Sequence, residues 1–395
     1  MKITKEAYHE ELNSFLSYLN NEKSKCLGIQ INQDADDCLD FAPFLKHTLN
    51  NLGDPFSGKG GHLETFKYER ELVSLMAGLL HLSPQNSWGY YTGGSSVSNL
   101  QAVHLGVKKL SQDVTLVTSV GAHNSICKAG AITRVKAFKE IETTENGDID
   151  TNAFSHFLES RNNNEKFIFC FCSGTVAKGA YDNVPELIRI LKEKGIKADN
   201  CFIHLDAALG GMITPFLENT PLKLDFSIPE IDSLSVSFHK RLGIPVPGSL
   251  FLLRKSSFDF SQSAPFIEDY KSHDTTVPGS RDGLSPFITL MKLKKIGYEG
   301  MADRTEKVLK KATSFANRLQ EEGIKVIKNP YSPCVYFEAP DDNILKEYHL
   351  PLYLHKDGFR YTHIFTMEHV TEEALEVFLS RMLSSRLAML HKSAG

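Results

Sequence analysis

The sequence predicts an α/β fold: a mostly parallel central sheet followed by a smaller α+β domain at the C-terminus. Two observations lead to this prediction. In the middle of the chain, short apolar runs alternate with amphipathic helical patterns, which is typical of parallel strands joined by crossover helices. Beyond about residue 287 the alternation stops, and a long helical pattern leads into three short strand patterns and a closing helix.

The strands predicted for the central sheet are apolar runs rich in β-branched and aromatic residues. They are "DVTLVTS" (113–119), "EKFIFCFCS" (165–173), "NCFIHLD" (200–206), "DSLSVSF" (232–238) and "SLFLLRK" (249–255). Helical patterns lie between several of them, as at 98–110 and 184–195. Only about ten residues separate the last two strands, too few for a helical crossover, so we expect these two strands to be antiparallel.

The C-terminal part opens with a helical pattern at 286–323, for which a break is predicted near Gly297–Gly300. Strand patterns follow in "IKVIKNP", "PCVYFEAP" and "RYTHIFTM", and the helical pattern "TEEALEVFLSRMLSSRLAML" closes the chain. We therefore divide the sequence into a helical and extended segment at 1–55, a large α/β domain at 56–300 and a small α+β domain at 301–395.

Composition indicates an ordinary soluble protein and limits its partners. The chain has 395 residues, 41% hydrophobic and 23% charged, with a formal net charge of −4. This balance gives no basic excess to suggest nucleic acid as a partner. No apolar run approaches the roughly 20 residues of a membrane span, and the charged, amphipathic N-terminus does not resemble a signal peptide. We therefore expect a cytoplasmic protein with no membrane partner.

The cysteines also favour a cytoplasmic protein. The seven are scattered without a paired framework, which is typical of reduced thiols in a cytosol. Cys170 and Cys172 lie two apart, on one face of a predicted strand. We interpret them as buried residues, because no second Cys or His pair follows at zinc spacing. No metal site is expected.

Three groups of residues that could bind a ligand or take part in catalysis lie where predicted strands end. Asp206 ends "CFIHLD", His239 and Lys240 follow "SLSVSF", and the Gly/Ser turn "YYTGGSSVSN" (90–99) opens a helix. Ligands of open parallel sheets bind at the carboxyl ends of the strands, and a helix N-terminus with free N–H groups suits an anion. Each group also has an ordinary interpretation, since an aspartate can cap a helix, a lysine is usually solvated, and the turn can be a plain capped loop.

Together the three groups match the needs of pyridoxal 5′-phosphate. That cofactor requires a lysine for covalent attachment, a carboxylate against its pyridine nitrogen and a cradle for its phosphate. The 34 residues between Asp206 and Lys240 allow each group its own strand end.

At this point the sequence resembles the group II pyridoxal-phosphate-dependent amino acid decarboxylases. The motifs are "GYYTGG", "AHNSICKA", "HLDAALGG", "SVSFHKRLGIP" and "VPGSRDG", and the resemblance covers most of the chain. Bacterial histidine decarboxylase is the most similar branch, with plant serine decarboxylase beside it. The resemblance implies the fold type I of aspartate aminotransferase, a PLP-dependent transferase-like fold. It also implies a homodimer whose active site lies at the subunit interface.

The resemblance assigns roles by motif. Lys240 resembles the Schiff-base lysine, Asp206 the partner of the pyridine nitrogen, and His123 the histidine that stacks on the ring; these three are the implied catalytic residues. The other implied contacts are Ala208 on the opposite ring face, Thr175 at the cofactor's edge, and Ser95, Ser96, Ser237 and His239 at the phosphate. The segment 273–283 reads as a surface loop on its own, whereas in the family it approaches the partner's cofactor through Ser280 and Arg281. His204 is expected only to brace its strand.

Two departures from the family pattern near the predicted cofactor site keep alternatives open, and a third, Glu368 where the family usually has proline, lies near the C-terminus. Val97 replaces an acidic residue in the phosphate turn, and Val176 replaces a hydroxyl after Thr175. The leading interpretation is decarboxylation of an L-amino acid, with histidine as the first candidate substrate and serine, aromatic or aliphatic amino acids as alternatives. Two other interpretations compete with it. One is a different lyase or an aminotransferase on the same fold, and the other is a non-catalytic homologue that acts by binding.

Overall fold

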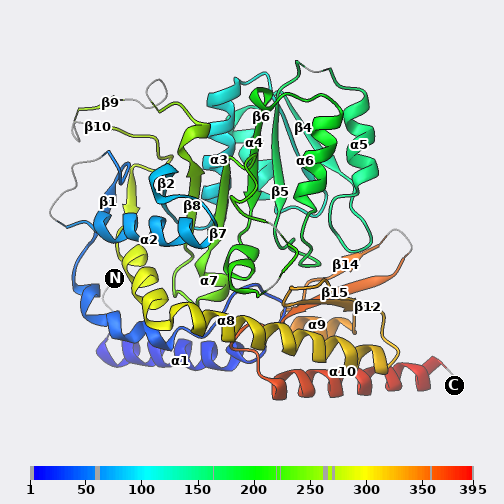
Figure 1. Ribbon diagram of the computed structural model, residues 1–395. Helices are drawn as coiled ribbons and strands as arrows, with labels where there is room; N and C mark the ends of the chain where they lie inside the picture. Colours follow the sequence, from blue (N-terminus) through cyan, green and yellow to red (C-terminus); the bar gives the residue numbers. More distant parts are fainter. Residues whose placement is uncertain are drawn as a thin grey trace. The chain divides into compact units, whose positions relative to one another are not determined.

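The computed structural model describes residues 4–57, 63–162, 164–218, 220–222, 224–260, 266–268, 272–355 and 358–393 (Figure 1). The chain forms two compact units. One spans Asp34–Glu306, and the other combines the chain up to Gln33 with the chain from Lys307 onward. The sequence-based division placed its boundaries at 55/56 and 300/301, which are different positions. That division stays a prediction, and its segments include residues outside the described ranges.

The larger unit contains a seven-stranded sheet in the order β2-β8-β7-β6-β5-β3-β4. Its strands are β2 (Ser87–Thr92), β3 (Thr115–Ser119), β4 (Ala137–Ile141), β5 (Phe167–Cys172), β6 (Cys201–Asp206), β7 (Ser233–Ser237) and β8 (Ser249–Arg254). Strands β4, β3, β5, β6 and β7 are parallel, and β8 is antiparallel to both β7 and β2. The mostly parallel sheet and the antiparallel β7–β8 pair are both confirmed. Strand β5 is buried along its whole length, as expected of a strand covered on both faces.

Two strands of this sheet were not predicted from the sequence. All six residues of strand β2 are buried, but Ser87, Gly89 and Thr92 interrupt its aromatic residues, so it has no continuous apolar run. The glycine is required by close packing, since a Cβ there would lie 2.1 Å from the carbonyl oxygen of Phe251 on β8. Strand β4 lies at one edge of the sheet, and four of its five residues are exposed. Neither strand therefore shows the apolar pattern that marks the other five.

Helices connect these strands and cover the sheet. They are α2 (Phe66–Leu79), α3 (Ser95–Leu110), α4 (Ser125–Thr133), α5 (Thr151–Glu159), α6 (Val184–Glu193) and the short α7 (Phe238–Arg241). Short 3-10 segments lie at Asp36–Lys46, Pro84–Asn86, Ala198–Asn200, Gly210–Met212, Thr214–Phe216 and Lys255–Ser257. Helix α6 begins where Asn183 accepts a hydrogen bond from the Glu186 N–H, a standard N-cap. Helix α3 packs against β6, β7 and β8, which places its N-terminus near the ends of these strands.

The segment 273–283 is not simply a surface loop. It contains the end of β10 (Ser272–His273), which pairs with β9 (Phe266–Ile267), and β11 (Ser280–Asp282), which pairs with β1 (Asn50–Leu52). Arg281 points into the protein and is 7% exposed. Its guanidinium forms an ion pair with the buried Glu69 and donates to the carbonyl oxygens of Gly53 (2.6 Å) and Tyr91 (3.2 Å).

This arrangement corrects the role implied for Arg281. A guanidinium held by Glu69 and two carbonyls of its own chain is not available to a partner subunit's cofactor. Glu69 accepts further hydrogen bonds from Asn51 Nδ2 and the Tyr91 N–H, both at 2.7 Å. The pair therefore joins β1, α2, β2 and β11 within one subunit.

We expect Arg281→Ala to destabilise the protein strongly. Removing one partner of a buried ion pair leaves the other charge uncompensated, which costs roughly 3–5 kcal/mol. Urea unfolding would measure the loss. The control is Arg189→Ala, because Arg189 pairs with Glu186 and Glu193 on an exposed helix surface and should matter far less. Similar losses in both variants would contradict a special role for the buried pair.

The smaller unit is an α+β structure around a four-stranded antiparallel sheet in the order β12-β13-β15-β14. Its strands are β12 (Val326–Ile327), β13 (Cys334–Glu338), β14 (Tyr353–Leu354) and β15 (Arg360–Phe365), and its helices include α1 (Lys5–Lys23), α9 (Asp342–Glu347) and α10 (Glu372–Ser393). The long helix α8 (Leu284–Glu321) runs from the larger unit into this one and is interrupted at Gly297 (φ 69°), which confirms the predicted break. Phe315, Phe337 and Phe378 lie in its apolar core. Within the described residues, no helix combines the length and apolar character needed to cross a bilayer.

Candidate active site

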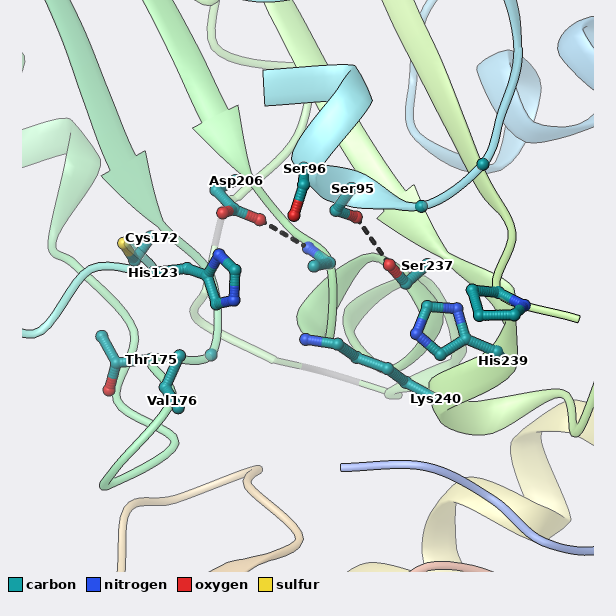
Figure 2. A pocket seen from close by; sticks show the side chains of 15 residues that line it. Ser95, Ser96, His123, Cys172, Thr175, Val176, Asp206, Ser237, His239 and Lys240 are labelled. Carbon is teal, nitrogen blue, oxygen red and sulfur yellow. Dashed lines mark hydrogen bonds between the residues drawn. The ribbon is translucent and has the colours of Figure 1, made fainter. Parts of the chain in front are cut away.

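The sequence-predicted residues, except Ser280, come together at the carboxyl ends of the central strands. They surround a cavity of about 220 Å³ (Figure 2). Its lining residues are Gly93, Gly94, Ser95, Ser96, His123, Cys172, Gly174, Thr175, Val176, Asp206, Ala208, Ser237, His239, Lys240 and Pro247. The strands β3, β5, β6 and β7 run parallel, so the segments that follow them meet at one edge of the sheet.

Lys240 lies on α7, the single helical turn that directly follows β7. Its half-buried side chain extends into the cavity (Figure 2). Burial lowers the pKa of Lys240, and the charge of Asp206 opposes this effect only in part. A lowered pKa increases the fraction of neutral amine, the form that attacks a carbonyl carbon.

Asp206 ends β6 and is 6% exposed. Its Oδ1 accepts a hydrogen bond from the Ala208 N–H at 3.1 Å and lies 3.4 Å from Ser235 Oγ, and its Oδ2 accepts a hydrogen bond from Asn99 Nδ2 at 2.7 Å. Both carboxylate oxygens are therefore held in a fixed orientation while the group still lines the cavity. The contact with Ala208 shows that Asp206 also supports the turn after its strand.

His123 lies in the loop between β3 and α4, on the wall of the cavity beside Asp206 and Thr175 (Figure 2). Its Nδ1 is 2.8 Å from Ser125 Oγ and accepts a hydrogen bond from the Ser125 N–H at 3.2 Å. Partial desolvation lowers the pKa of His123, with Asp206 acting in the opposite direction. A neutral ring that accepts at Nδ1 carries its proton on Nε2.

An anion cradle lies where α3 begins. Gly93 and Gly94 line the cavity, and a Cβ added to either would meet no protein atom within 4 Å, so a side chain there would occupy open space. Gly94 also has φ +120°, a conformation that favours glycine. The glycines thus leave room beside a helix N-terminus, where backbone N–H groups and the helix dipole stabilise an anion.

Hydroxyl groups line the same cradle. Ser95 Oγ is 2.6 Å from Ser237 Oγ (Figure 2) and 3.0 Å from Ser249 Oγ. Ser96 adds a second hydroxyl to the cavity wall, and the His239 ring is anchored through Nδ1, 3.1 Å from the Gly248 carbonyl oxygen. All four predicted phosphate-contact residues therefore lie at one end of the site.

The remaining predicted residues divide into two groups. Thr175 and Ala208 line the cavity, and Thr175 Oγ1 accepts a hydrogen bond from the Ala180 N–H at 2.9 Å. Ser280 does not line it, and its side chain is exposed on β11. Its contact with a cofactor would have to come through another subunit, so that role stays a prediction.

Val97 and Val176, the two departures in the motifs predicted to bind the cofactor, differ in position. Val176 lines the cavity and places methyl groups on its wall. Val97 is half-buried on α3 and is not a lining residue. Loss of the acidic residue at 97 therefore leaves the cavity wall unchanged, whereas Val176 makes it more apolar.

Several polar residues that support the site were missed by sequence reasoning. Asn99, Ser125, Ser235 and Ser249 are buried and bond to residues far away in the chain. Asn99, Ser125 and Ser235 each lie within a quoted motif, whereas Ser249 only begins a predicted strand. His204 is buried beside this group, as its predicted bracing role suggests.

The cysteines show no sign of metal binding. Cys170 and Cys172 are both buried on β5, and burial raises the pKa of each thiol well above its ordinary value. In the part of the chain that the structure describes, no cluster of three or more His, Cys, Asp or Glu side chains is suited to a metal ion.

Comparison with known proteins identifies the family. Residues 67–339 match the pyridoxal-dependent decarboxylase conserved domain. The chain belongs to this family. It is 34% identical to serine decarboxylase 3 of Oryza sativa subsp. japonica over 354 residues. The matched region spans 89% of this chain and 77% of the relative. It is 30% identical to histidine decarboxylase of Morganella morganii over 340 residues. That match spans 86% of this chain and 87% of the relative.

Solved structures confirm the fold of this decarboxylase. L-methionine decarboxylase from Streptomyces sp. 590 superimposes with a TM-score of 0.86 at 22% identity, covering 96% of this chain and 94% of that chain. The chain is therefore a pyridoxal 5′-phosphate-dependent amino acid decarboxylase with the fold of that family.

The cavity fits this cofactor. The open glycine turn and the hydroxyls at the start of α3 suit a phosphate, and Lys240 and Asp206 offer an amine and a carboxylate of the kind that the ring requires. The residues that would hold the cofactor therefore line one cavity of the larger unit, except for the contact predicted for a partner's Ser280.

Proposed function

We propose that this decarboxylase converts L-histidine to histamine and carbon dioxide, with Lys240, Asp206 and His123 as its catalytic residues. The observation that carries the proposal is the convergence of these three side chains on one cavity beside an anion cradle. Ser95, Ser96, Ser237 and His239 would hold the cofactor's phosphate, and Thr175 and Ala208 would contact its ring.

Pyridoxal 5′-phosphate supplies the electron sink that stabilises the electron pair left on Cα when carbon dioxide departs. The residues of this chain supply binding and orientation. Asp206 would accept a hydrogen bond from the pyridine nitrogen and keep that nitrogen protonated. Lys240 would supply the amine that attaches the cofactor, and the Nε2–H of His123 could donate a hydrogen bond within the cavity.

Histidine is the first candidate substrate because the Morganella relative, a histidine decarboxylase, matches over nearly equal shares of both chains. Serine is the second candidate, since the rice relative at 34% identity is a serine decarboxylase. Both substrates carry a side chain that can form hydrogen bonds. A site built for such a side chain discriminates strongly against analogues that lack it.

The test is incubation of the cofactor-loaded protein with each of the twenty amino acids. Identification of the amine by mass spectrometry, together with measurement of the carbon dioxide released, distinguishes the candidates. Histamine as the fastest product supports the proposal, and ethanolamine would assign the enzyme to serine. Consumption of a keto acid without release of carbon dioxide would instead indicate an aminotransferase.

We also propose that the enzyme acts as a homodimer in the cytoplasm, with active sites that include Ser280 from the partner. Helix α1 supports association, because it has no buried residue although it carries Phe15, Leu16 and Leu19, which are 59%, 56% and 46% exposed. A second copy covering such a face would bury apolar surface, and an obligate interface exceeds roughly 2,000 Å² in total. None of the seven cysteines forms a disulfide, which supports a reducing compartment.

Mixed dimers test the shared site. We expect Lys240→Ala and Ser280→Trp to be inactive separately, because the tryptophan would block the neighbouring cavity. In a heterodimer of these two variants, one of the two active sites combines an unaltered Lys240 with an unaltered Ser280 from the partner. Activity should therefore reappear after mixing and reassembly. Ser160→Trp, an exposed serine at the end of α5, is the control and should remain active by itself. An active Ser280→Trp protein, or inactive heterodimers verified by mass, would contradict the shared site.

A further inference from the structure

Asn99 occupies a central position behind the catalytic residues. It lies in the second turn of α3, is fully buried and does not line the cavity. Its Nδ2 donates to Asp206 Oδ2 at 2.7 Å and to Ser125 Oγ at 2.9 Å. Its Oδ1 accepts from Ser235 Oγ at 3.1 Å and lies 3.0 Å from His204 Nε2. The four contacts use the full hydrogen-bonding capacity of the amide.

The charge of Asp206 determines which way this amide points. A carboxylate oxygen can only accept, so the Asn99 nitrogen must face Asp206 and the Asn99 oxygen must face His204. His204 therefore donates from Nε2. Burial lowers the pKa of His204 to about 4, so its ring is neutral and carries one N–H. Its Nδ1 then accepts from Ser233 Oγ at 2.9 Å.

The same amide connects Asp206 to His123. Ser125 Oγ accepts a hydrogen bond from Asn99 and can therefore direct its own proton to His123 Nδ1, 2.8 Å away. This contact leaves the Nε2–H of His123 free to face the cavity. One buried side chain thus orients two of the three catalytic residues, which come from different strand ends.

We propose that Asn99 is a positioning residue for the decarboxylation, holding the Asp206 carboxylate directly and the His123 ring through Ser125. The proposal rests on the proposed roles of Asp206 and His123. Without the amide, Asp206 Oδ2 loses its 2.7 Å donor, and the buried His204 and Ser235 lose their shared acceptor. The carboxylate would then no longer be fixed against the pyridine nitrogen.

The first test compares Asn99→Ala with Gln101→Ala. Gln101 is a matched control, because it is a fully buried amide on the same helix whose partners are Tyr90, Thr275 and Val277, none of which lines the cavity. We expect Asn99→Ala to lower kcat on the order of 10²-fold with little change in KM, and to shift the visible absorption of the bound cofactor. Gln101→Ala should reduce stability but leave kcat and the spectrum near those of the unaltered enzyme. Equal changes in both variants would overturn the proposal.

Asn99→Asp provides a conservative rescue. Two carboxyl groups at hydrogen-bonding distance cannot both ionise, so one pKa of the pair is raised. Below that raised pKa the protonated group can donate to its partner as the amide does, and above it both groups are charged and repel. We therefore expect the ratio of kcat to that of the unaltered enzyme to rise as pH falls, with a parallel return of the absorption spectrum. His123, His204 and Lys240 also face this region, but they titrate in both proteins and the ratio reduces their contribution. A ratio independent of pH would overturn the proposal.

A third measurement needs no activity. In the cofactor-free protein with ¹⁵N-labelled histidine, the ring signals should show His204 protonated on Nε2 and His123 unprotonated on Nδ1, with His204→Gln and His123→Gln used for assignment. A His204 proton on Nδ1 would require the opposite amide orientation and would exclude the contact with Asp206. If the amide orientation is verified but Asp206→Asn remains fully active, the role of Asp206 fails independently of the Asn99 contacts.

Discussion

Replacing Lys240 by alanine should abolish turnover while leaving the protein folded. In the proposed function this amine attaches the cofactor covalently, so the loss should be on the order of 10⁴-fold or more in kcat. Folding should be little affected, because Lys240 lines a cavity and its partial burial already disfavours the charge, as its lowered pKa shows. Steady-state assays and urea unfolding measure the two effects separately.

Chemical labelling distinguishes this role from a general need for positive charge. Borohydride reduction of the cofactor-loaded protein should attach the cofactor irreversibly to the peptide that contains Lys240. Lys240→Arg keeps the charge but should be as inactive as Lys240→Ala, and the exposed Lys136→Ala should behave like the unaltered enzyme. A label found on another lysine would make the assignment wrong.

Asp206→Asn should reduce kcat on the order of a thousandfold, because a neutral amide cannot stabilise the protonated pyridine nitrogen in the transition state. Cofactor binding should change much less, since Lys240 and the residues of the anion cradle remain. The dissociation constant of the cofactor and kcat are measured together. Because the new amide brings one donor–donor contact to Asn99, Ala208 or Ser235, the unfolding midpoint is measured as well.

Asp182 supplies a matched control for this substitution. It is fully buried and accepts backbone hydrogen bonds from Ile149 (2.9 Å) and Cys172 (2.7 Å), but it does not line the cavity. Burial raises the pKa of Asp182 to about 7, and an amide at this position also brings a donor–donor contact, with the N–H of Ile149 or of Cys172, so the variant controls for that loss of stability. We expect Asp182→Asn to keep near-normal kcat. Near-normal turnover in Asp206→Asn would instead mean that Asp206 only supports its turn.

Much of the site could be predicted because it is local in sequence. Each chemical group follows a short apolar strand, and parallel strands bring their carboxyl ends to one edge of a sheet. Asp206 and Lys240 were therefore expected to meet in space before any contact was known. Strand β2 was missed because Ser87, Gly89 and Thr92 interrupt its aromatic residues, although all six of its residues are buried.

Arg281 shows where a sequence pattern misleads. A polar, glycine-rich segment suggests an exposed loop, yet the guanidinium is buried against Glu69, 212 residues earlier in the chain. Nothing local to either residue indicates the pair, because the pairing depends on β11 lying beside β1. The tertiary structure alone assigns this arginine to the stability of its own subunit.

The sequence by itself determined five of the seven strands of the central sheet, the cofactor chemistry and the identity of the groups at the strand ends, because short-range patterns and motifs encode these features. Only the tertiary structure decided how those groups are oriented. Asn99 reaches Asp206 across 107 positions of the chain and His204 across 105, and Ser95 reaches Ser249 across 154. Hydrogen bonds of this kind depend on distances of about 3 Å between side chains from different elements, and such distances exist only once helix α3 has packed on the sheet.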